Sequence, residues 1–203
     1  MPTKSNSKKT KKNTDRKATV KRKTKETDIS IELNLDGVGD SEIDTRIEFL
    51  NHLFELFSRH SSTDLKIKAS GDLDHHITED IGICLGEAIM KSLGNKKGIR
   101  RYGDKTIPMD ESLATCALDL GGRPYFNIDL KISKGLIEDS QAEDLEHLFE
   151  SISINSKINL HIIVHYGTNE HHKVEAAIKA FARAFKEAKE IVDDKIPSTK
   201  GVL

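Results

Sequence analysis

The stretches that decide the fold are HLFE at residues 52–55 with HHITE at 75–79, and HLFE at 147–150 with HHKVE at 171–175. The gap from the single histidine to the histidine pair is 23 residues in the first copy and 24 in the second. Six of the nine histidines lie in these two copies. The repetition indicates an internally duplicated chain, and it predicts two equivalent half-sites.

Hydrophobic periodicity predicts an α+β fold in which both halves begin with strand and end in the same order, helix, strand, helix. The first half is expected to contain strands at 29–36 and 64–70 and helices at 46–60 and 76–93. The second half is expected to contain strands at 113–120, 124–132 and 158–165 and helices at 141–152 and 172–192. The first two of these strands flank a turn at Gly121-Gly122. LKIKA at 65–69 aligns with LHIIV at 160–164 and agrees with the duplication.

Composition divides the chain into five segments. Residues 1–25 hold eleven Lys or Arg and a single acid, Asp15, so a disordered basic tail is expected there. The other segments are a first half-domain at 26–95, a polar linker containing Gly and Pro at 96–111, a second half-domain at 112–193 and a C-terminal tail at 194–203. The basic tail at 1–25 is interpreted as a solubilising extension or a weak nucleic-acid contact. The folded body is acidic, which argues against nucleic acid as the main partner.

The overall composition is that of a soluble globular protein, with 36% apolar and 32% charged residues. No apolar run approaches the roughly 18 residues that span a bilayer, so no membrane partner is expected. An apolar signal segment is not visible at the N-terminus. Cys84 and Cys116 lie in apolar stretches and are interpreted as buried reduced thiols, which fits a cytoplasmic protein.

Each HHxxE motif places metal-binding side chains on a helix. His75 and Glu79 are four residues apart and share one helical face, whereas the adjacent His76 points roughly 100° away. One motif can therefore serve two metal ions. With the single histidines, the candidate ligands are six imidazoles and two carboxylates: His52, His75, His76, Glu79, His147, His171, His172 and Glu175.

Three histidines and one glutamate per ion suit Mn²⁺, Fe²⁺ or Zn²⁺ better than Ca²⁺ or Mg²⁺, which prefer oxygen ligands. An octahedral ion would keep two positions for substrate. The remaining histidines, His60, His161 and His165, have no partner in the other copy and are interpreted as structural. A di-metal hydrolase and a metal-storing shell are alternative functions, although imidazole dominates here and hydrolases favour bridging aspartates.

Short motifs over about residues 22–203 make the chain resemble the imidazoleglycerol-phosphate dehydratase family. They are RKTKET (22–27), LNLDGVG (33–39), FLNHL (49–53), DHHITED (74–80), YGD (102–104), PMDE (108–111), LDLGGRP (118–124), NEHHKVEA (169–176) and STKGVL (198–203). The resemblance implies two half-domains, each a four-stranded sheet packed on two helices. The hydrophobic pattern gives at most three strands per half, so the resemblance implies that this pattern misses at least one strand in each half.

The resemblance also implies the chemistry. The expected enzyme is a hydro-lyase of histidine biosynthesis that converts D-erythro-imidazole-glycerol phosphate to imidazole-acetol phosphate with two Mn²⁺ ions per active site. The family forms trimers that assemble into a 24-subunit shell, with metal sites between subunits. Glu26 is implied as the proton-handling catalytic residue. Arg101, Arg123, Ser198 and Lys200 are implied as the phosphate-binding residues, with Arg100 a rival for Arg101. The C-terminal tail at 194–203 is thereby implied to bind substrate.

The chain departs from the family pattern near the first site. The loop GDLDHH at 71–76 is shorter than usual. Thr45-Arg46 stands where Thr-Gly is usual, and Asn51 replaces the usual Asp before His52. The last change is expected to remove a hydrogen-bond acceptor for His52.

Overall fold

The computed structural model describes residues 16–201 of the 203-residue chain. The first half contains β1 (Lys17–Lys23), β2 (Thr27–Asn34), β3 (Ser41–Asp44), α1 (Glu48–Ser61), β4 (Asp64–Gly71) and α2 (Asp74–Leu93). The second half contains β5 (Tyr102–Met109), β6 (Ser112–Asp119), β7 (Tyr125–Asp129), α3 (Ala142–Ser156), β10 (Asn159–Tyr166) and α4 (Glu170–Ala188). A short pair of strands, β8 (Leu136–Ile137) and β9 (Ser140–Gln141), precedes α3.

The two halves have the same topology. The strand order is β1-β2-β4-β3 in the first sheet and β5-β6-β10-β7 in the second. In both sheets the last strand of this order runs parallel to its neighbour, and the other pairs are antiparallel. The prediction of a duplicated α+β fold with a four-stranded sheet and two helices per half is therefore confirmed.

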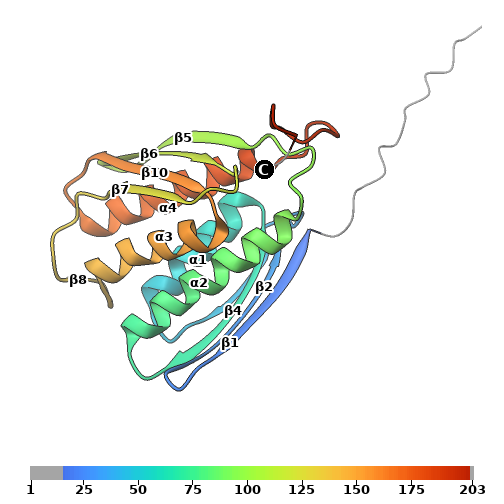
Figure 1. Ribbon diagram of the computed structural model, residues 1–203. Coiled ribbons are helices and arrows are strands. Elements are labelled where there is room, and N and C mark those ends of the chain that lie inside the picture. The colour runs from blue at the N-terminus through green and yellow to red at the C-terminus, as the bar shows by residue number, and fades with distance from the viewer. Residues whose placement is uncertain (1–15, 202–203) are drawn as a thin grey trace, which may run out of the picture.

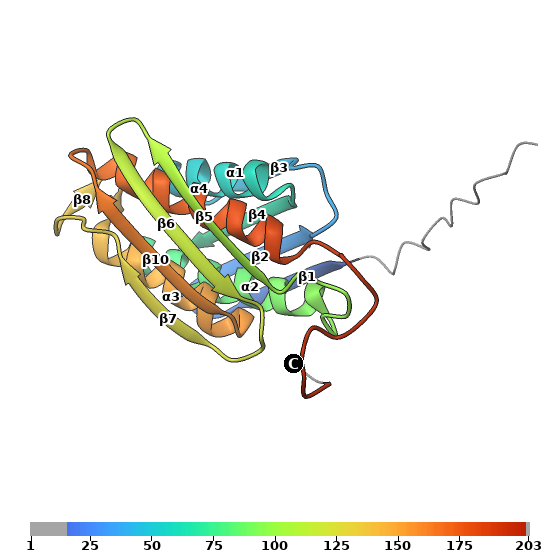
Figure 2. The ribbon, with the colours of Figure 1, turned by 90° about the horizontal axis from the view of Figure 1, so that it is seen from above.

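The four helices lie between the two sheets (Figure 1). Figure 2 shows β5, β6, β10 and β7 side by side across the helices. Helix α1 packs against α4, and α2 packs against α3. Each of these contacts joins a helix of one half to a helix of the other, so the crossed packing decides which parts of the two sequence copies meet.

Apolar faces explain why the layers associate. In β2 the alternate residues Ile29, Ile31 and Leu33 are buried, which is the period-two pattern of a strand with one face on the core. On α1 the buried apolar residues recur at helical spacing and include Phe57, whose ring stacks on Phe181 of α4 at a centroid distance of 5.3 Å. Burial of these faces removes apolar surface from water and holds the helices between the sheets.

The segment 96–111, predicted as a linker, contains strand β5. It pairs with β6 along its whole length. Gly103 and Pro108 gave the segment the composition of a loop, but a proline is tolerated because β5 is an edge strand. Gly103 is required for packing, since a Cβ there would lie 2.1 Å from the carbonyl oxygen of Ala184 in α4.

The tail predicted to be disordered over residues 1–25 includes strand β1. Residues 1–15 lie outside the described residues. Strand β1 pairs with β2, and its Val20 is buried. The strand escaped prediction because its exposed positions are mostly Lys and Arg, and Val20 is its single fully buried residue.

Other elements also differ from the expected ones. Strands β6 and β7 flank the Gly121-Gly122 turn but do not pair, because β10 lies between them and runs parallel to β7. The short strand β3 has no fully buried residue and was not expected. Helix α4 ends at Ala188 rather than residue 192. A two-residue turn can join strands that pair with each other or strands that pair with a third strand. The local sequence pattern does not distinguish these two cases.

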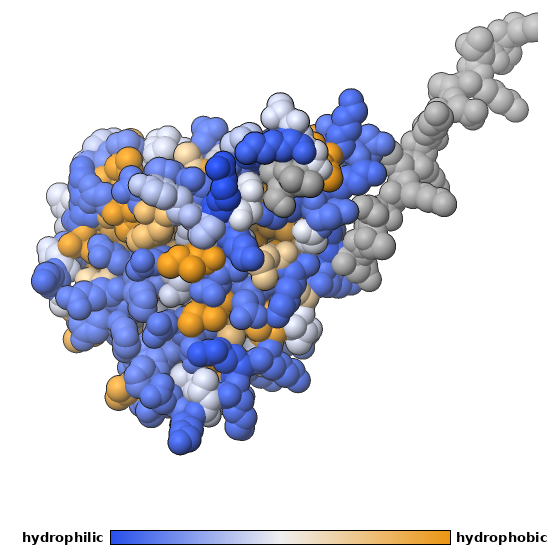
Figure 3. All heavy atoms as spheres, in the orientation of Figure 1, coloured by the Kyte–Doolittle hydropathy of each residue, from blue (hydrophilic) through white to orange (hydrophobic). Residues whose placement is uncertain are grey.

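Within residues 16–201, the helices are all too short or too polar to cross a membrane. The face shown in Figure 3 is largely hydrophilic and carries separate apolar patches. Several large apolar side chains of the described chain are more than half exposed, among them Val38, Tyr102, Tyr125, Leu136 and Tyr166.

Candidate metal centres

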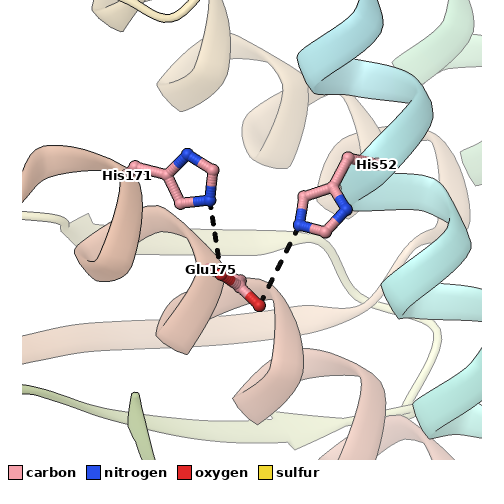
Figure 4. A group of neighbouring side chains, drawn as sticks. All are labelled: His52, His171 and Glu175. Atoms are coloured by element: carbon pink, nitrogen blue, oxygen red, sulfur yellow. Dashed lines mark ion pairs between the residues drawn. The ribbon is translucent and has the colours of Figure 1, made fainter. Parts of the chain in front are cut away.

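Two histidines and one glutamate meet where α1 packs against α4 (Figure 4). His52 comes from α1, whereas His171 and Glu175 come from the first two turns of α4. The Nε2 atom of His171 lies 3.3 Å from Oε2 of Glu175, and Nε2 of His52 lies 3.9 Å from Oε1. One potential ligand atom of each residue lies within 4.8 Å of the other two. These three residues are called the α1–α4 cluster.

A matching group lies where α2 packs against α3. His75 and Glu79 come from the start of α2, and His147 comes from α3. The Nε2 atom of His147 lies 3.9 Å from Oε1 of Glu79. The rings of His75 and His147 have a centroid distance of 5.8 Å, the same as that between the two histidines of the first cluster. These residues are called the α2–α3 cluster.

The two sequence copies exchange their histidines. The single histidine of the first copy, His52, joins the HHxxE motif of the second copy, and His147 joins the motif of the first. The cause is the crossed packing of the helices, because α1 contacts α4 and α2 contacts α3. Sequence spacing left the pairing open, since it depends on which helices touch.

His76 and His172 stand apart from both clusters. The Nδ1 atom of His76 lies 2.8 Å from Oδ1 of Asp72, and that of His172 lies 2.7 Å from Oε2 of Glu111. Hydrogen bonding to these carboxylates raises the pKa of both histidines. The bonds fix each ring and direct its Nε2 atom away from the carboxylate, an arrangement typical of metal-binding histidines.

Carboxylates also hold the motif histidines that lie in the clusters. The Nδ1 atom of His75 lies 2.6 Å from Oδ1 of Asp144, and that of His171 lies 3.1 Å from Oε1 of Glu138. None of these carboxylate partners was named from the sequence. Only Asp72 had a local signal, its position four residues before His76; the others are brought in from distant elements.

The donor chemistry of both clusters fits a divalent first-row metal ion. Two imidazoles with one carboxylate form a set that such ions accept, and it keeps further coordination positions for other ligands. In the part of the chain that the structure describes, three such donors meet at these two clusters. Of the eight ligands named from the sequence, the fold thus brings six together in two groups of three.

A cation accompanies Glu175 in the α1–α4 cluster. The Nζ atom of Lys179 lies 2.5 Å from Oε1 of Glu175. Burial tends to raise the pKa of the Glu175 carboxyl, but the hydrogen bond and positive charge of Lys179 outweigh it, and the pKa is lowered. Glu175 is therefore held as a carboxylate in a nearly buried position, with 8% of its side chain exposed.

Glu26 lies in the turn between β1 and β2, beside the start of α2. Its Oε2 atom is 4.0 Å from Nδ1 of His76, and its side chain is exposed. Its carbonyl oxygen accepts a hydrogen bond of 3.0 Å from the backbone N–H of Asp72. The turn between β5 and β6 occupies the corresponding place in the second half, and there Oδ2 of Asp110 is 3.8 Å from Nε2 of His172. A carboxylate thus lies near each outlying histidine.

The residues assigned to phosphate lie at the other end of the helices. The backbone N–H of Arg101 donates to the carbonyl oxygen of Ala188, the last residue of α4. His171 lies in the first turn, so the helical rise separates the two ends by about 25 Å. The structure therefore does not bring Arg101 together with the α1–α4 cluster of the same chain.

Local contacts of these candidates differ. Arg101 pairs with both carboxylate oxygens of Asp119, at 2.7 and 2.9 Å, and donates to the carbonyl oxygen of Pro197. Arg123 and Lys200 are exposed. The hydroxyl of Ser198 accepts a hydrogen bond from the backbone N–H of Lys200. The rival Arg100 pairs with Glu190 instead.

The three histidines without a repeat partner take part in neither cluster. Nε2 of His165 lies 2.7 Å from the hydroxyl oxygen of Thr115. The ring of His161 stacks on Tyr125 at a centroid distance of 5.6 Å. Burial is the largest cause that lowers the pKa of His60. These environments agree with their interpretation as structural.

Comparison with known proteins gives one consistent result. A family model described as imidazoleglycerol-phosphate dehydratase matches residues 45–185. The chain is 50% identical over 191 residues to the imidazoleglycerol-phosphate dehydratase of Chlorobium phaeovibrioides, with 93% of this chain and 96% of that protein covered. It is 49% identical over 191 residues to the enzyme of that name from Thermodesulfovibrio yellowstonii, with 93% and 100% covered.

Solved structures agree. The crystal structure of imidazoleglycerol-phosphate dehydratase from Staphylococcus aureus matches with a TM-score of 0.79 and 38% identity, covering 86% of this chain and 98% of that one. A Pyrococcus furiosus protein, solved in complex with (S)-C348, matches with a TM-score of 0.79 and 34% identity, covering 91% and 100%. The similarity thus extends over most of the folded chain.

Proposed function

This chain belongs to the imidazoleglycerol-phosphate dehydratase family of hydro-lyases, and on that premise we propose that it converts D-erythro-imidazole-glycerol phosphate to imidazole-acetol phosphate. The reaction removes water from the substrate as a step of histidine biosynthesis. We place it in the cytoplasm, where the buried free thiols of Cys84 and Cys116 would stay reduced. The observation that carries the proposal is the pair of matching histidine–glutamate clusters on a duplicated scaffold.

The proposed cofactor is two Mn²⁺ ions per active site. The α1–α4 and α2–α3 clusters would hold them, because two imidazoles and a carboxylate suit this class of ion. When bound, the ions would bind the substrate imidazole and stabilise the negative charge that develops as a carbon-bound proton leaves.

Completion of each metal centre is proposed to require another subunit. Each cluster offers two histidines and one glutamate, whereas His76 and His172 remain outside both. A neighbouring chain that contributes these two residues would give each ion three histidines and one glutamate. The proposed assembly is the trimer and 24-subunit shell of the family. Exposed aromatic side chains such as Tyr102, Tyr125 and Tyr166 suit such contacts.

The position of the phosphate-binding candidates supports the same assembly. Arg101, Arg123, Ser198 and Lys200 would bind the phosphate through charge-assisted hydrogen bonds. Because Arg101 lies about 25 Å along α4 from the histidines, these residues would serve the clusters of a different subunit. Arg101 would then share its guanidinium between Asp119 and the phosphate.

Glu26 is the proposed proton-handling residue. Its carboxylate is exposed and lies 4.0 Å from the ring of His76, so it borders the place where substrate would meet that histidine. A carboxylate in this position can take a proton from the substrate or return one to the leaving hydroxyl. The fixed backbone contact between Glu26 and Asp72 would keep it in place.

The direct test is an assay of purified protein with Mn²⁺ and imidazole-glycerol phosphate. Formation of imidazole-acetol phosphate is expected, and E26Q is expected to lower kcat while the bound Mn²⁺ stays unchanged. Absence of product from the Mn²⁺-loaded protein would reject the proposal. Product formation that survives H76A and H172A would reject the assignment of the metal centres.

A further inference from the structure

The duplication allows the two clusters to be compared position by position. His75 and Glu79 of α2 correspond to His171 and Glu175 of α4, with a constant offset of 96 residues. One turn beyond the glutamate, α4 carries Lys179 and α2 carries Ile83. The two clusters therefore have the same ligands but different neighbours.

Lys179 makes direct contact with the ligand carboxylate. Its Nζ atom lies 2.5 Å from Oε1 of Glu175, the oxygen atom that also faces His52. Both side chains are largely buried, at 17% exposure for Lys179 and 8% for Glu175. A hydrogen-bonded ion pair in this position is little screened by solvent.

The next turn increases the difference. Arg183 of α4 corresponds to Glu87 of α2. Burial is the largest cause that lowers the pKa of His60 on α1, and the charges of Lys179 and Arg183 lower it further. The charges of Lys179 and Arg183 on α4 thus reach His60 on α1, where the negative charge of Glu175 acts in the opposite direction. On α2 the equivalent positions are neutral and acidic.

We propose that the two metal centres are inequivalent: Mn²⁺ fills the α2–α3 cluster first, and Lys179 makes the α1–α4 cluster the weaker site. Lys179 competes with the ion for Glu175, and its charge repels a divalent cation bound there. The α2–α3 cluster has Ile83 at this position and neither penalty. The inference rests on the proposed function in one respect, the use of these clusters as metal centres.

Mn²⁺ titration of the chelator-stripped full-length protein at fixed pH tests the order of filling. Isothermal calorimetry, with free Mn²⁺ followed by electron paramagnetic resonance, is expected to give two classes of sites whose affinities differ by about tenfold or more. H147A is expected to remove the tighter class, and H52A the weaker one. A single class of sites in the unmodified protein would overturn the proposal.

Reciprocal exchange assigns the difference to Lys179. K179M is expected to tighten the weaker class by about tenfold, and I83K is expected to weaken the tighter class by a similar factor. K91M is a matched control, because Lys91 pairs with Glu87 four residues away on α2 but lies outside both clusters. Its titration should match that of the unmodified protein.

Two results would reject the role of Lys179: an unchanged weaker class in correctly folded K179M, or, if K179M does not fold, an unchanged tighter class in I83K. Binding and catalysis are separable in this design. Two classes of Mn²⁺ sites without dehydratase activity would reject the proposed function and leave the inequivalence standing. Dehydratase activity with a single class of Mn²⁺ sites would support the proposed function and reject the inequivalence.

Discussion

Arg46 occupies a backbone conformation that normally favours glycine, with φ of 59°. Its guanidinium donates to Oδ1 of Asp74 and to the backbone carbonyl oxygens of Gly71 and Asp72. It therefore holds the loop that leads to His75 and His76. A glycine would adopt this backbone conformation without strain, whereas the arginine adds direct contacts to the loop.

Two substitutions at this position separate contact from backbone strain. R46A keeps the left-handed conformation and loses the contacts, so the free energy of unfolding should fall by up to about 1 kcal/mol. R46G loses the same contacts but relieves roughly 1 kcal/mol of backbone strain, so its free energy of unfolding should be close to that of the unmodified protein. Urea denaturation of the metal-free variants measures both. R46A more stable than R46G would contradict this account.

Asn51 shows what a single substitution changes. Its Oδ1 atom accepts hydrogen bonds from the backbone N–H and the hydroxyl of Thr45, at 3.0 and 2.7 Å. The side chain thus supports the chain entering α1. The hydrogen bonds of the Asn51 side chain are to Thr45 and Glu48 rather than to His52. The sequence identified the changed residue but not the direction in which its side chain points.

Lys189 is a buried cation outside the clusters, with 5% of its surface exposed. Its Nζ atom donates to the carbonyl oxygens of Leu35 and Ser62 and joins the end of α4 to the first half. Burial is the main cause that lowers its pKa to about 8.

This pKa predicts a pH-dependent stability. Between about pH 8 and pH 10.5 the folded chain carries neutral Lys189, whereas the unfolded chain still binds the proton. The free energy of unfolding should therefore rise with pH in this window, relative to K189M, by as much as about 3 kcal/mol. Below pH 8 both states are protonated, and the difference between the two proteins should be constant. Urea denaturation of both proteins from pH 7 to pH 10.5 measures it; a constant difference throughout would disprove the shift.

At the scale of elements, glycines set the distance between α2 and α3. A Cβ added to Gly82 would lie 2.7 Å from Cβ of Ser151 and 3.1 Å from the carbonyl oxygen of Leu148. One added to Gly86 would lie 2.7 Å from Cβ of Asn155. Close helix packing at Gly82 places His147 opposite His75 and Glu79.

G82A is therefore expected to destabilise the protein although alanine favours helix by about 1 kcal/mol. The clash should lower the free energy of unfolding by about 1–3 kcal/mol and weaken Mn²⁺ binding at the α2–α3 cluster but not at the α1–α4 cluster. Denaturation and Mn²⁺ titration measure the two effects. E87A, a partly exposed change on the same helix, should alter stability by less than about 0.5 kcal/mol. A G82A protein as stable as the unmodified one would show that the helices separate freely.

Local patterns predicted the elements that have strong periodicity. Apolar residues at helical spacing located α1 and α2, and alternation located β2 and β4. Strand β5 was missed because Gly103 and Pro108 are loop residues in most contexts, and their tolerance here depends on α4 and on an edge position. The exchange of His52 and His147 between the copies was likewise beyond a local pattern, because it depends on contacts between distant helices.

At the scale of the whole molecule, the proposal divides each active site among subunits, and complementation tests this. A chain with H76A and H172A lacks the outlying donors, and a chain with E79A and E175A lacks complete clusters. Each should be inactive alone. Dissociation with chelator and reassembly of the mixture with Mn²⁺ should restore partial dehydratase activity, because an intact cluster can meet intact donors from the other chain.

A chain carrying all four substitutions provides the control, since mixing it with the H76A/H172A protein supplies no donors. That mixture should stay inactive. Mixed assemblies of the first two chains that form, bind Mn²⁺ and show no activity would place all ligands of a centre within one subunit.

The exchange of histidines between the copies has an evolutionary consequence. Neither half of the chain holds a complete cluster, because each cluster draws one ligand from one half and two from the other. An ancestor of half the present length would have built both clusters by pairing with an identical copy of itself, related by twofold symmetry. Duplication and fusion of its gene would have turned an association between two molecules into a permanent one, and would have freed the two sets of neighbours to diverge.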